Sequence, residues 1–326
     1  MEADLVARAG LEFQTIQTGQ LRGRAPWTAL RNLARMRTGA RQARKIIDAF
    51  RPDVCFATGG YVCAPVVWAA SRAHVPILIY LPDLEPGMAI RVLGRLATRV
   101  AVSFPEALPW FGGKGVVTGY PVRAEFMAAA ADRAAARAHF GLEAGLKTVL
   151  VFGGSRGSRS INQAVSAALP QLLAVCQVIH VSGTLDWDTV QHQAAGLPAT
   201  LRTRYHAVAY LHDDMAQAMA AADLAVTRAG ASTLGEFPVM GLPSILVPYP
   251  YAGQHQDVNA DFLVHRGAAI KLADQELAGQ LTAAILGLLG DDERLARLAA
   301  GARQLARPGA AQAIAAELRQ LVRNAA

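Results

Sequence analysis

Residues able to bind a nucleotide cluster in the stretch from Asp223 to Asn259. Asp223–Thr227 is a short apolar run rich in β-branched residues, which predicts a buried strand. Ser232 and Thr233 are good N-cap types, and we expect them to begin a short helix with Glu236 in its first turn. Free N–H groups at a helix start attract phosphate, and a carboxylate can accept hydrogen bonds from the hydroxyls of a ribose. The pattern predicts a nucleotide site, and the alternative is a well-capped helix beside a polar loop.

A second predicted strand, Ser244–Val247, leads into a loop rich in hydrogen-bonding side chains. Gln256 and Asn259 in this loop can both donate and accept hydrogen bonds. Ligands of α/β proteins bind at the carboxyl ends of parallel strands. We therefore expect the loop and the helix start to share one site.

A glycine-rich turn, Gly153–Gly157, follows the predicted strand Thr148–Phe152 and precedes a helix. Glycines let the backbone approach an anion, so the turn indicates phosphate binding. The turn also matches the G-x-S-x-G pattern of serine hydrolases, in which Ser155 would be the nucleophile and Asp223 and His255 its partners. No HGG-type oxyanion segment precedes it and no lysine stands at the Walker offset, so the hydrolase is kept only as an alternative.

Three other groups of residues have competing interpretations. Asp186 and Asp188 match a metal-binding DxD pattern, but an acidic pair at a helix start is the preferred interpretation. His180 and His206 lack a second ligand at metal spacing and are expected to be structural. Arg123 could reach a diphosphate with its planar fork or form a surface ion pair.

Strands and helices alternate along the chain, which predicts parallel sheets with helices on both faces. We expect an α/β protein of two doubly wound, Rossmann-like domains that face a cleft. The predicted domains are residues 1–124, residues 125–309 and a C-terminal helix at 310–326 that packs back on the first domain. Residues 12–16 read as a strand, and 128–138 as one alanine-rich helix.

Composition narrows the class of partner. The 326 residues carry a net charge of +7 with a pI of about 9.7, which favours phosphates, nucleic acid or an anionic membrane as partners. Aromatic residues make up 6% and do not interleave with basic ones, which argues against single-stranded nucleic acid. The cysteines, Cys55, Cys63 and Cys176, have no CxxC spacing and read as small buried hydrophobes in a reducing compartment. No apolar run approaches the roughly 18 residues of a membrane span.

The stretch Leu21–Ile47 is basic and contains no acidic residue. Apolar side chains recur within it at helical spacing, among them Trp27, Leu30 and Leu33, with Arg31 and Arg35 between them. Such a helix can lie on an anionic leaflet. The alternative is a solvated basic face whose apolar stripe packs in the core.

Several motifs in order, over nearly the whole chain, resemble those of the MurG family of peptidoglycan N-acetylglucosaminyltransferases. The matching residues are Met1–Val6, Gly59–Tyr61 with Pro65, Pro86-Gly87, Val117–Arg123, Phe152–Ser155 with Gly157 and Asn162, Arg228–Ala231 with Thr233 and Glu236, Gly241–Pro243, and His255-Gln256 with Asn259-Ala260.

The resemblance implies a GT-B fold and an inverting transfer of N-acetylglucosamine that uses no metal and no cofactor. The donor would be UDP-N-acetylglucosamine, and the acceptor the muramoyl 4-hydroxyl of lipid I, an undecaprenyl diphosphate, with lipid II as product in peptidoglycan synthesis. The enzyme would be a peripheral protein on the cytoplasmic face of the cell membrane, in contact with anionic inner-leaflet lipids and not with nucleic acid.

The resemblance also implies roles for individual residues. Arg123 and Ser155 would meet the donor diphosphate, and Leu211 would bracket uracil through its backbone. Ala231, Ser232, Thr233 and Glu236 would hold the nucleotide, and Gln256 would contact the donor sugar with support from Asn259. Gly59, Gly60 and Tyr61 would face the acceptor diphosphate. Trp27, Leu30, Arg31, Leu33 and Arg35 would contact the membrane.

The chain departs from the family pattern in two places. The family's opening strand and its GGTGGH turn, with the histidine usually favoured as base, are missing, so we expect Met1 to be an internal methionine and this chain to be unstable or inactive alone. Tyr80–Asp83 stands where the family has HEQN, which makes Asp83 the candidate base. Two further alternatives remain open: another GT-B transferase for a lipid-linked sugar, and an inactive UDP-sugar-binding protein.

Overall fold

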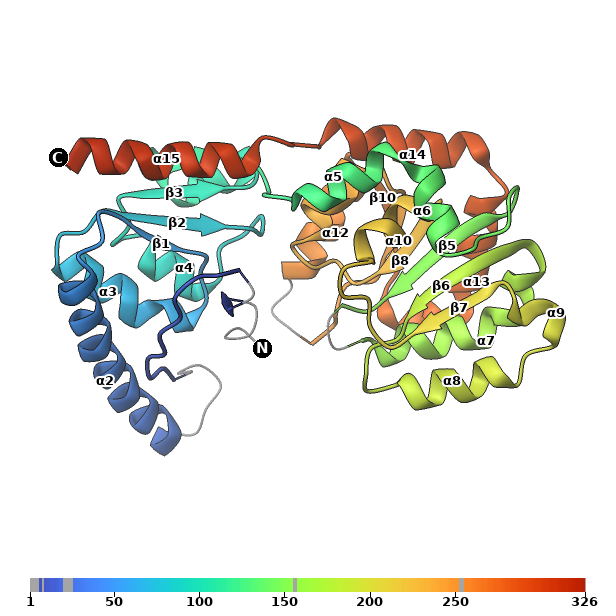
Figure 1. Ribbon diagram of the computed structural model, residues 1–326, viewed down its shortest axis with the longest axis horizontal. Coiled ribbons are helices and arrows are strands. Elements are labelled where there is room, and N and C mark those ends of the chain that lie inside the picture. The colour runs from blue at the N-terminus through green and yellow to red at the C-terminus, as the bar shows by residue number, and fades with distance from the viewer. Residues whose placement is uncertain (1–5, 8, 20–25, 155–156, 252–254, 326) are drawn as a thin grey trace. The chain divides into compact units, whose positions relative to one another are not determined.

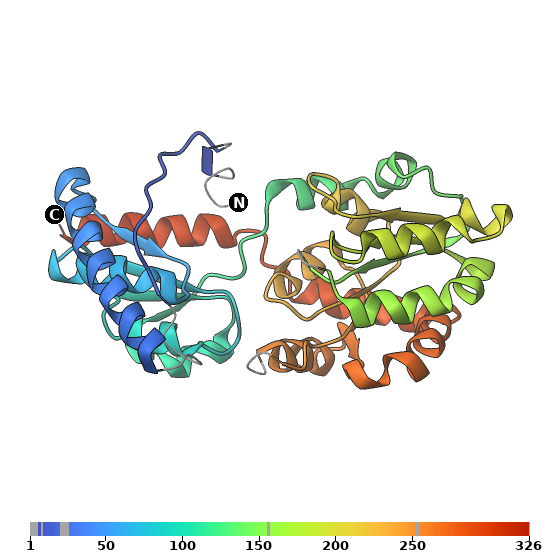
Figure 2. The same ribbon diagram turned by 90° about the horizontal axis from the view of Figure 1, so that it is seen from below.

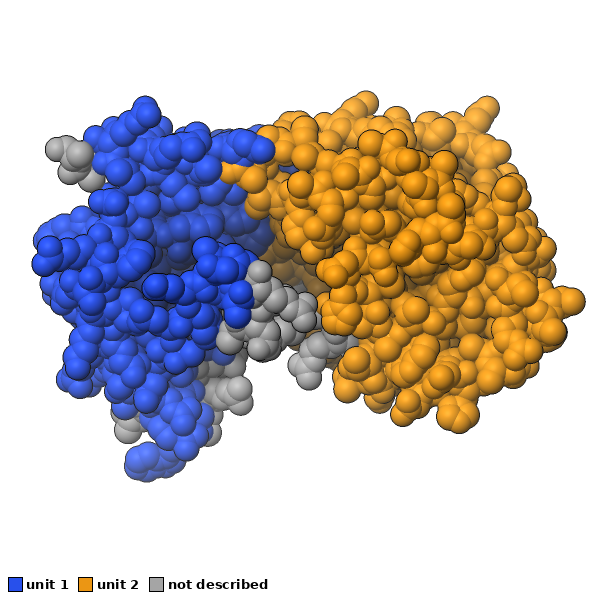
Figure 3. Space-filling model, in the orientation of Figure 1, with its two compact units in different colours: residues 1–82, 86–118, 312–326 blue, residues 83–85, 119–311 orange. Residues whose placement is uncertain are grey.

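The computed structural model describes residues 6–7, 9–19, 26–154, 157–251 and 255–325. The chain divides into two compact units, which Figure 3 colours separately. Unit 1 comprises residues 1–82, 86–118 and 312–326, and unit 2 comprises residues 83–85 and 119–311. The motif Met1–Val6 lies outside the described residues except for Val6.

Unit 1 is built on a parallel four-stranded sheet in the order β1-β2-β3-β4. The central strand β2 is wholly buried, and its side chains alternate between two separate cores, as a strand's period of two requires. The elements of unit 1 are α2 (Pro26–Phe50), β1 (Cys55–Ala57), the 3-10 helix η1 (Tyr61–Cys63), α3 (Ala64–Arg72), β2 (Ile77–Leu81), α4 (Met88–Leu93), β3 (Arg99–Val102), η2 (Pro105–Trp110), η3 (Gly112–Lys114), β4 (Gly115–Val117) and α15 (Ala310–Ala325).

Helices cover both faces of the unit 1 sheet (Figure 1). On one face, Ile77 and Ile79 pack in a core with residues of α2, α3 and α4. On the other face, Leu78 and Tyr80 pack against Leu321 and other residues of α15. The last helix of the chain is therefore part of the core of unit 1.

Unit 2 is built on a parallel six-stranded sheet in the order β10-β9-β8-β5-β6-β7. The chain runs outward in one direction from β5 and then returns to β8 on the other side of it, which makes the β5–β8 boundary a topological switch point. The strands are β5 (Lys147–Phe152), β6 (Cys176–Val181), β7 (Tyr205–Val208), β8 (Leu224–Thr227), β9 (Ser244–Leu246) and β10 (Ala269–Lys271).

Figures 1 and 2 show helices on both faces of this sheet. One core joins β5, β6 and β8 to α7, α13 and α14. On the other face, Phe152 of β5 meets Phe237 of α11 edge to face at 6.2 Å. The helices are α5 (Ala124–Ala131), α6 (Arg133–His139), α7 (Arg159–Val175), α8 (Trp187–Ala195), α9 (Ala199–Arg202), α10 (Met215–Ala221), α11 (Thr233–Met240), α12 (His255–His265), η4 (Asp274–Glu276), α13 (Leu277–Leu289) and α14 (Asp292–Gln304).

The predicted fold class is confirmed, since both sheets are parallel and each unit is an α/β layer structure. Four local predictions differ from the structure. Residues 12–16 form no strand, the alanine-rich helix is divided at Asp132, strand β10 was not foreseen, and His255–Asn259 lie in α12 instead of a loop. Asp132 divides its helix because its carboxylate caps a new one, accepting from the N–H of Ala135 at 2.9 Å.

Candidate functional site

A pocket of about 610 Å³ opens in unit 2 where β5, β8 and β9 end. The N-terminal turns of α7 and α11 both line it, so it lies at the switch point, where open parallel sheets bind ligands. Its walls consist of Phe152, Gly153, Gly154, Gly157, Ser158, Arg159, Ser160, Gln163, Thr227, Arg228, Gly230, Ser232, Thr233, Tyr249, Tyr251, Gln256 and Asp274.

The glycine-rich turn after β5 is one wall of this pocket, and close packing requires its glycines. A Cβ at Gly153 would lie 2.2 Å from the backbone nitrogen of Ser158, and one at Gly157 would lie 2.2 Å from the carbonyl oxygen of Ser182. Gly157 also has φ +76°, which L side chains rarely adopt. The turn thus brings bare backbone to the start of the 17-residue helix α7, an arrangement suited to an anion. Ser155 lies outside the described residues.

The half-buried side chain of Arg228 connects several segments at the pocket. The guanidinium of Arg228 donates to Asp274 at 2.5 Å and to the Ser160 hydroxyl at 2.8 Å, and the same hydroxyl donates to Asp274 at 2.8 Å. Arg228 also lies over the ring of Tyr249, 5.4 Å from its centroid. These contacts join the end of β8, the start of α7 and the segment before α13.

Helix α11 begins at the pocket, but not with the predicted capping bond. Ser232 occupies the N-cap position without a side-chain capping hydrogen bond, and the Thr233 hydroxyl donates to the carbonyl of Gly230 at 2.7 Å. The hydroxyl of Ser232 instead bonds to Glu236. The first N–H groups of α11 instead donate to backbone carbonyls: Thr233 to Gly230 at 3.1 Å, Leu234 to Ala231 at 3.1 Å, and Glu236 to Ser232 at 2.9 Å.

Glu236 has a half-buried carboxyl group whose pKa is shifted. Burial raises its pKa from 4.5 to about 7, although Arg123 and the hydrogen bond from Ser232 act in the opposite direction. Arg123 itself pairs with Glu125 at 2.7 Å and lies over the ring of Phe126, so the structure shows the surface ion pair, and the contact with a diphosphate stays a prediction.

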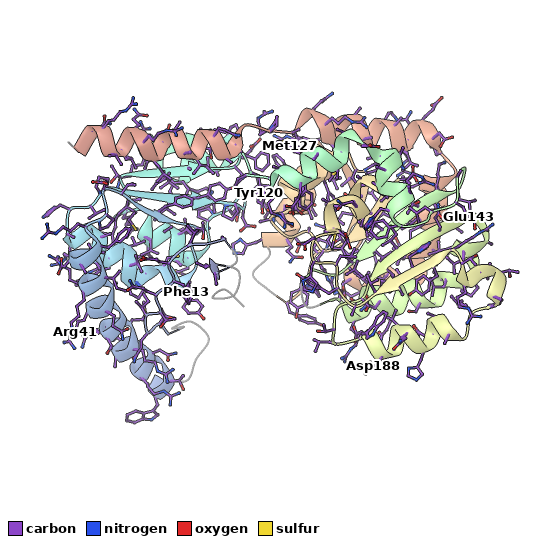
Figure 4. All side chains as sticks on the ribbon, viewed as in Figure 1. Phe13, Arg41, Tyr120, Met127, Glu143 and Asp188 are labelled. Carbon is purple, nitrogen blue, oxygen red and sulfur yellow. The ribbon has the colours of Figure 1, made fainter. Side chains whose placement is uncertain are left out.

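Asp83 and Asn259 are in contact within unit 2. The Asn259 amide donates to Asp83 at 3.1 Å and to the carbonyl of Ala229 at 3.2 Å, while its oxygen is buried without a partner among the described residues. Burial, together with the charges of Glu236 and Asp83, raises the pKa of Tyr120 to about 12. Tyr120, labelled in Figure 4, packs against α11 at Gly235, where a Cβ would lie 2.2 Å from its ring.

Gln256 has its amide orientation set by the backbone. The N–H of Tyr249 donates to its Oε1 at 2.9 Å, so its Nε2 is left to donate elsewhere. Tyr251, which is 83% exposed, meets the Tyr249 ring at 5.6 Å on the same rim of the pocket.

Apart from Leu211, the predicted donor residues that the structure describes, together with the candidate base Asp83, form two groups in unit 2. Ser232, Thr233 and Gln256 line the pocket, with Ala231 between two lining residues. Glu236, Arg123, Asn259 and Asp83 form the group beside α11, and Leu211 is buried in the segment after β7, away from the pocket walls. The sequence analysis did not identify the pocket residues Arg159, Ser160, Asp274, Tyr249 and Tyr251. The signal that could have indicated them was the presence of basic and aromatic residues close to predicted strand ends.

The geometry is incompatible with the serine hydrolase alternative. Asp223 precedes β8 and accepts from the N–H of Thr148 at the start of β5, and it pairs with Arg133 at 2.6 Å. The Ser155 turn follows the opposite end of β5, about 13 Å away along the strand. Asp223 therefore cannot orient a base beside that turn.

Asp186 and Asp188 stand at the start of α8, as the preferred interpretation predicted. Asp186 is the N-cap residue, yet its carboxylate makes no capping bond and contacts Arg159 and Asn162. In the part of the chain that the structure describes, no group of three or more His, Cys, Asp and Glu is arranged to hold a metal ion.

A separate turn in unit 1 follows β1. Gly59 and Gly60 both have positive φ, +93° and +80°, and the turn leads through η1 into α3. A Cβ at Gly59 would lie 2.6 Å from Ile90, so the glycine permits a close approach to α4. Tyr61 is 45% exposed at the helix start.

Unit 1 also carries an apolar groove of about 920 Å³ between α2, α3 and α4. Trp68, Val92 and Leu96 contribute to its apolar surface, and Arg37 and Arg41 belong to its basic rim (Figure 4 labels Arg41). The predicted membrane residues Trp27, Arg31, Leu33 and Arg35 are exposed on the first half of α2, and the side chain of Leu30 lies outside the described residues. No helix among the described residues is long and apolar enough to span a bilayer.

Known proteins are similar to this chain in sequence and fold. Residues 1–102 match the glycosyltransferase family 28 N-terminal domain, and residues 148–314 match the C-terminal domain of the same family. The chain is 46% identical to the UDP-N-acetylglucosamine–N-acetylmuramyl-(pentapeptide) pyrophosphoryl-undecaprenol N-acetylglucosamine transferase of Roseiflexus sp., over 99% of this chain and 82% of that protein. It is 39% identical to the protein of the same name from Desulforamulus reducens, over 95% of this chain and 85% of that one.

Two solved structures have the same fold. The crystal structure of MurG from Acinetobacter baumannii superposes with a TM-score of 0.75 at 26% identity, covering 98% of this chain and 88% of that one. A UDP-GlcNAc 2-epimerase from Neisseria meningitidis bound to UDP-GlcNAc gives a TM-score of 0.68 at 12% identity, over 98% of this chain and 88% of that one, which shows likeness of fold alone.

Proposed function

The chain belongs to the MurG family of N-acetylglucosaminyltransferases, with the GT-B fold, and from that premise we propose how its residues carry out the reaction. It is a glycosyltransferase of peptidoglycan synthesis that transfers N-acetylglucosamine from UDP-N-acetylglucosamine to the muramoyl 4-hydroxyl of lipid I, forming lipid II. The observation that carries the donor assignment in this chain is the pocket at the β5–β8 switch point, with two helix N-termini in its wall.

The donor nucleotide occupies the unit 2 pocket in this proposal. The diphosphate lies at the glycine-rich turn with Ser155 and the start of α7, and Arg123 leaves Glu125 to reach it. Glu236 accepts the ribose hydroxyls, and the backbone at Leu211 brackets uracil. Ala231, Ser232 and Thr233 present the helix start to the nucleotide. The Nε2 of Gln256 donates to the sugar, because its Oε1 is already occupied by the Tyr249 N–H.

Asp83 is proposed as the base. The acceptor 4-hydroxyl oxygen bonds to the anomeric carbon from the face opposite UDP while the bond to the UDP oxygen breaks, and UDP keeps that electron pair. The proton goes to the Asp83 carboxylate. Asn259 orients this carboxylate through its 3.1 Å hydrogen bond, and the helix N-termini stabilise the charge on departing UDP. The step inverts the anomeric configuration and needs no metal.

The acceptor lipid is proposed to use unit 1. The Gly59–Tyr61 turn exposes backbone N–H groups to the acceptor diphosphate, since its glycines hold conformations closed to other residues. The basic side chains of α2, with the rim of the groove, attract anionic inner-leaflet lipids and keep the protein on the cytoplasmic face of the membrane. Nucleic acid is not a partner in this proposal.

Transfer of labelled N-acetylglucosamine to lipid I is the deciding experiment, run on wild type, Asp83→Asn and the control Asp188→Asn. Asparagine keeps an oxygen that can accept from Asn259 and removes only the proton acceptor. We expect Asp83→Asn to lose at least about 100-fold in kcat, with unchanged binding of UDP-N-acetylglucosamine, and Asp188→Asn to match wild type.

Unchanged kcat in Asp83→Asn refutes the assignment of Asp83 as the base. Donor binding without turnover by wild type supports the inactive-binder alternative, and activity contradicts the expectation that this chain is inactive alone.

A further inference from the structure

A chain of hydrogen bonds, buried at Tyr205 and His180 and exposed at Arg159, crosses unit 2 beside the donor pocket. The hydroxyl of Tyr205 lies 2.7 Å from Nδ1 of His180, and Nε2 of His180 lies 3.0 Å from Oδ1 of Asn162. The Asn162 amide nitrogen lies 2.9 Å from Asp186, whose other carboxylate oxygen lies 3.2 Å from Nε of Arg159. The chain therefore runs from β7 through β6 and α7 to the start of α8.

The direction of every hydrogen bond in this chain follows from its acceptors. Asn162 Nδ2 faces two groups that only accept, the carbonyl of Ser182 at 2.8 Å and the carboxylate of Asp186. Its Oδ1 must then accept from His180, which places the histidine proton on Nε2. Nδ1 of His180 is left to accept from the Tyr205 hydroxyl. Burial lowers the pKa of His180 to about 4, so this neutral tautomer persists at ordinary pH.

The carboxylate of Asp186 makes contacts other than the capping bond that its position allows. As the N-cap residue of α8 it could accept from the first N–H groups of that helix, yet it makes no such bond. Both carboxylate oxygens instead contact α7, one at Arg159 and one at Asn162. Arg159 and Asn162 are three residues apart and share one face of that helix. The carboxylate thus holds an arginine on the first turn of the helix that faces the pocket.

Arg159 is placed to meet an anion. Its side chain is 74% exposed, lines the pocket and is the first residue of α7. The described hydrogen bonds use one of its five N–H donors, the Nε on Asp186. Fixing a guanidinium through Nε leaves its outer edge, with both terminal nitrogens, for a bidentate contact with phosphate.

We propose that Arg159 binds the donor diphosphate, and that Asp186, Asn162, His180 and Tyr205 are positioning residues that hold its guanidinium at the pocket. The inference rests on the proposed donor site and adds a cation to it. A purely structural pair between α7 and α8 is the competing explanation, and it makes no distinction between ligands with and without phosphate.

The test compares the binding of UDP-N-acetylglucosamine with that of uridine in calorimetry. Arg159→Ala is expected to weaken binding of the nucleotide sugar about 10- to 100-fold, as for loss of a charge-assisted hydrogen bond, and to leave uridine unchanged. Arg297→Ala is the matched control, an exposed arginine paired with Glu293 at 3.4 Å on α14, and is expected to bind as wild type does. Equal binding by Arg159→Ala and wild type overturns the proposal.

A double-mutant cycle tests the positioning residues. We expect Asp186→Ala to weaken UDP-N-acetylglucosamine binding several-fold and to have no further effect in the Arg159→Ala background. Tyr205→Phe, which keeps the ring and removes the hydroxyl, is expected to behave in the same way to a smaller degree. Losses that persist undiminished without Arg159 overturn the positioning role. A wild-type chain that binds no UDP-N-acetylglucosamine overturns the proposed function as well, whereas a wild type that binds and transfers while Arg159→Ala matches it overturns this inference alone.

Discussion

Glu236 should make donor binding depend on pH near neutrality. Burial raises its pKa to about 7, so about nine tenths of the free protein carries the carboxylate at pH 8 and about one tenth at pH 6. If the ribose hydroxyls require the ionised form, the apparent affinity falls by about tenfold between these values, or about 1.4 kcal/mol. Glu236→Gln removes the titration, and we expect its affinity to be weaker than that of wild type at pH 8 and flat with pH.

Calorimetric titration with UDP-N-acetylglucosamine from pH 5.5 to pH 8.5, a range of about three units, measures this dependence. Both of its phosphates are esterified, so the ligand itself has no titrating proton in that range. A donor that lacks the ribose 2′-hydroxyl should show a smaller decrease at low pH, because it gives the carboxylate one hydroxyl fewer. A flat wild-type profile, or the same slope in Glu236→Gln, would refute the assignment of Glu236 to the ribose.

The contribution of Glu236 to folding stability changes with pH in the opposite direction to its contribution to donor binding. The pKa of Glu236 is higher in the folded protein than the usual 4.5, so the folded state holds this proton more tightly. The stability that it contributes is present below pH 4.5 and is lost as the pH rises towards 7. Without ligand, Glu236→Gln should therefore gain thermal stability relative to wild type as the pH is raised over this window.

Three further predictions concern packing and charge. Gly157→Ala should weaken donor binding and destabilise the protein by more than the about 1–2 kcal/mol that a left-handed alanine costs, because its Cβ would clash with the Ser182 carbonyl. Urea unfolding measures this loss, and Gly141→Ala is the control for the backbone cost alone, because Gly141 has φ +61° and nothing within 4 Å of an added Cβ. Equal losses of stability in the two variants would contradict the clash. Leu321→Ala should cost about 2–5 kcal/mol in unfolding of unit 1, and a loss below 1 kcal/mol, by roughly the same scale, would mean that α15 is dispensable. Arg41→Glu should lower the affinity for anionic vesicles, measured by co-sedimentation, by up to about tenfold, whereas Arg297→Glu should leave this affinity unchanged. Equal losses in the two variants would mean that net charge alone determines vesicle binding.

The sequence was sufficient for the fold class and for the strands that end at the pocket, because buried parallel strands are apolar runs bounded by glycine and proline. It was less reliable where tertiary contacts decide. His255–Asn259 looked like a loop because polar residues dominate it, but the helix that it begins buries Asn259 against Ala229. Strand β10 has only three residues, too short for its alternation to be recognised.

The candidate site was predictable only in part, for a similar reason. Ser232, Thr233 and Gln256 adjoin predicted strand ends and were found from local pattern. Asp274 reaches the pocket from a segment with no motif, through an ion pair with Arg228 that spans 46 residues. Long-range pairs of this kind leave no local trace in the residue types around them.

Unit 1 is assembled from segments that precede and follow unit 2 in the sequence, and this has a consequence for synthesis. The described strands of its sheet end at Val117, but Leu78 and Tyr80 lie on a face covered by α15, which is made after unit 2. Unit 2 lies almost wholly between these two parts, so all of its strands leave the ribosome before α15 does. During translation unit 2 can complete its fold while the face of the unit 1 sheet that carries Leu78 and Tyr80 still lacks its covering helix, so this apolar face stays exposed to water until α15 is made.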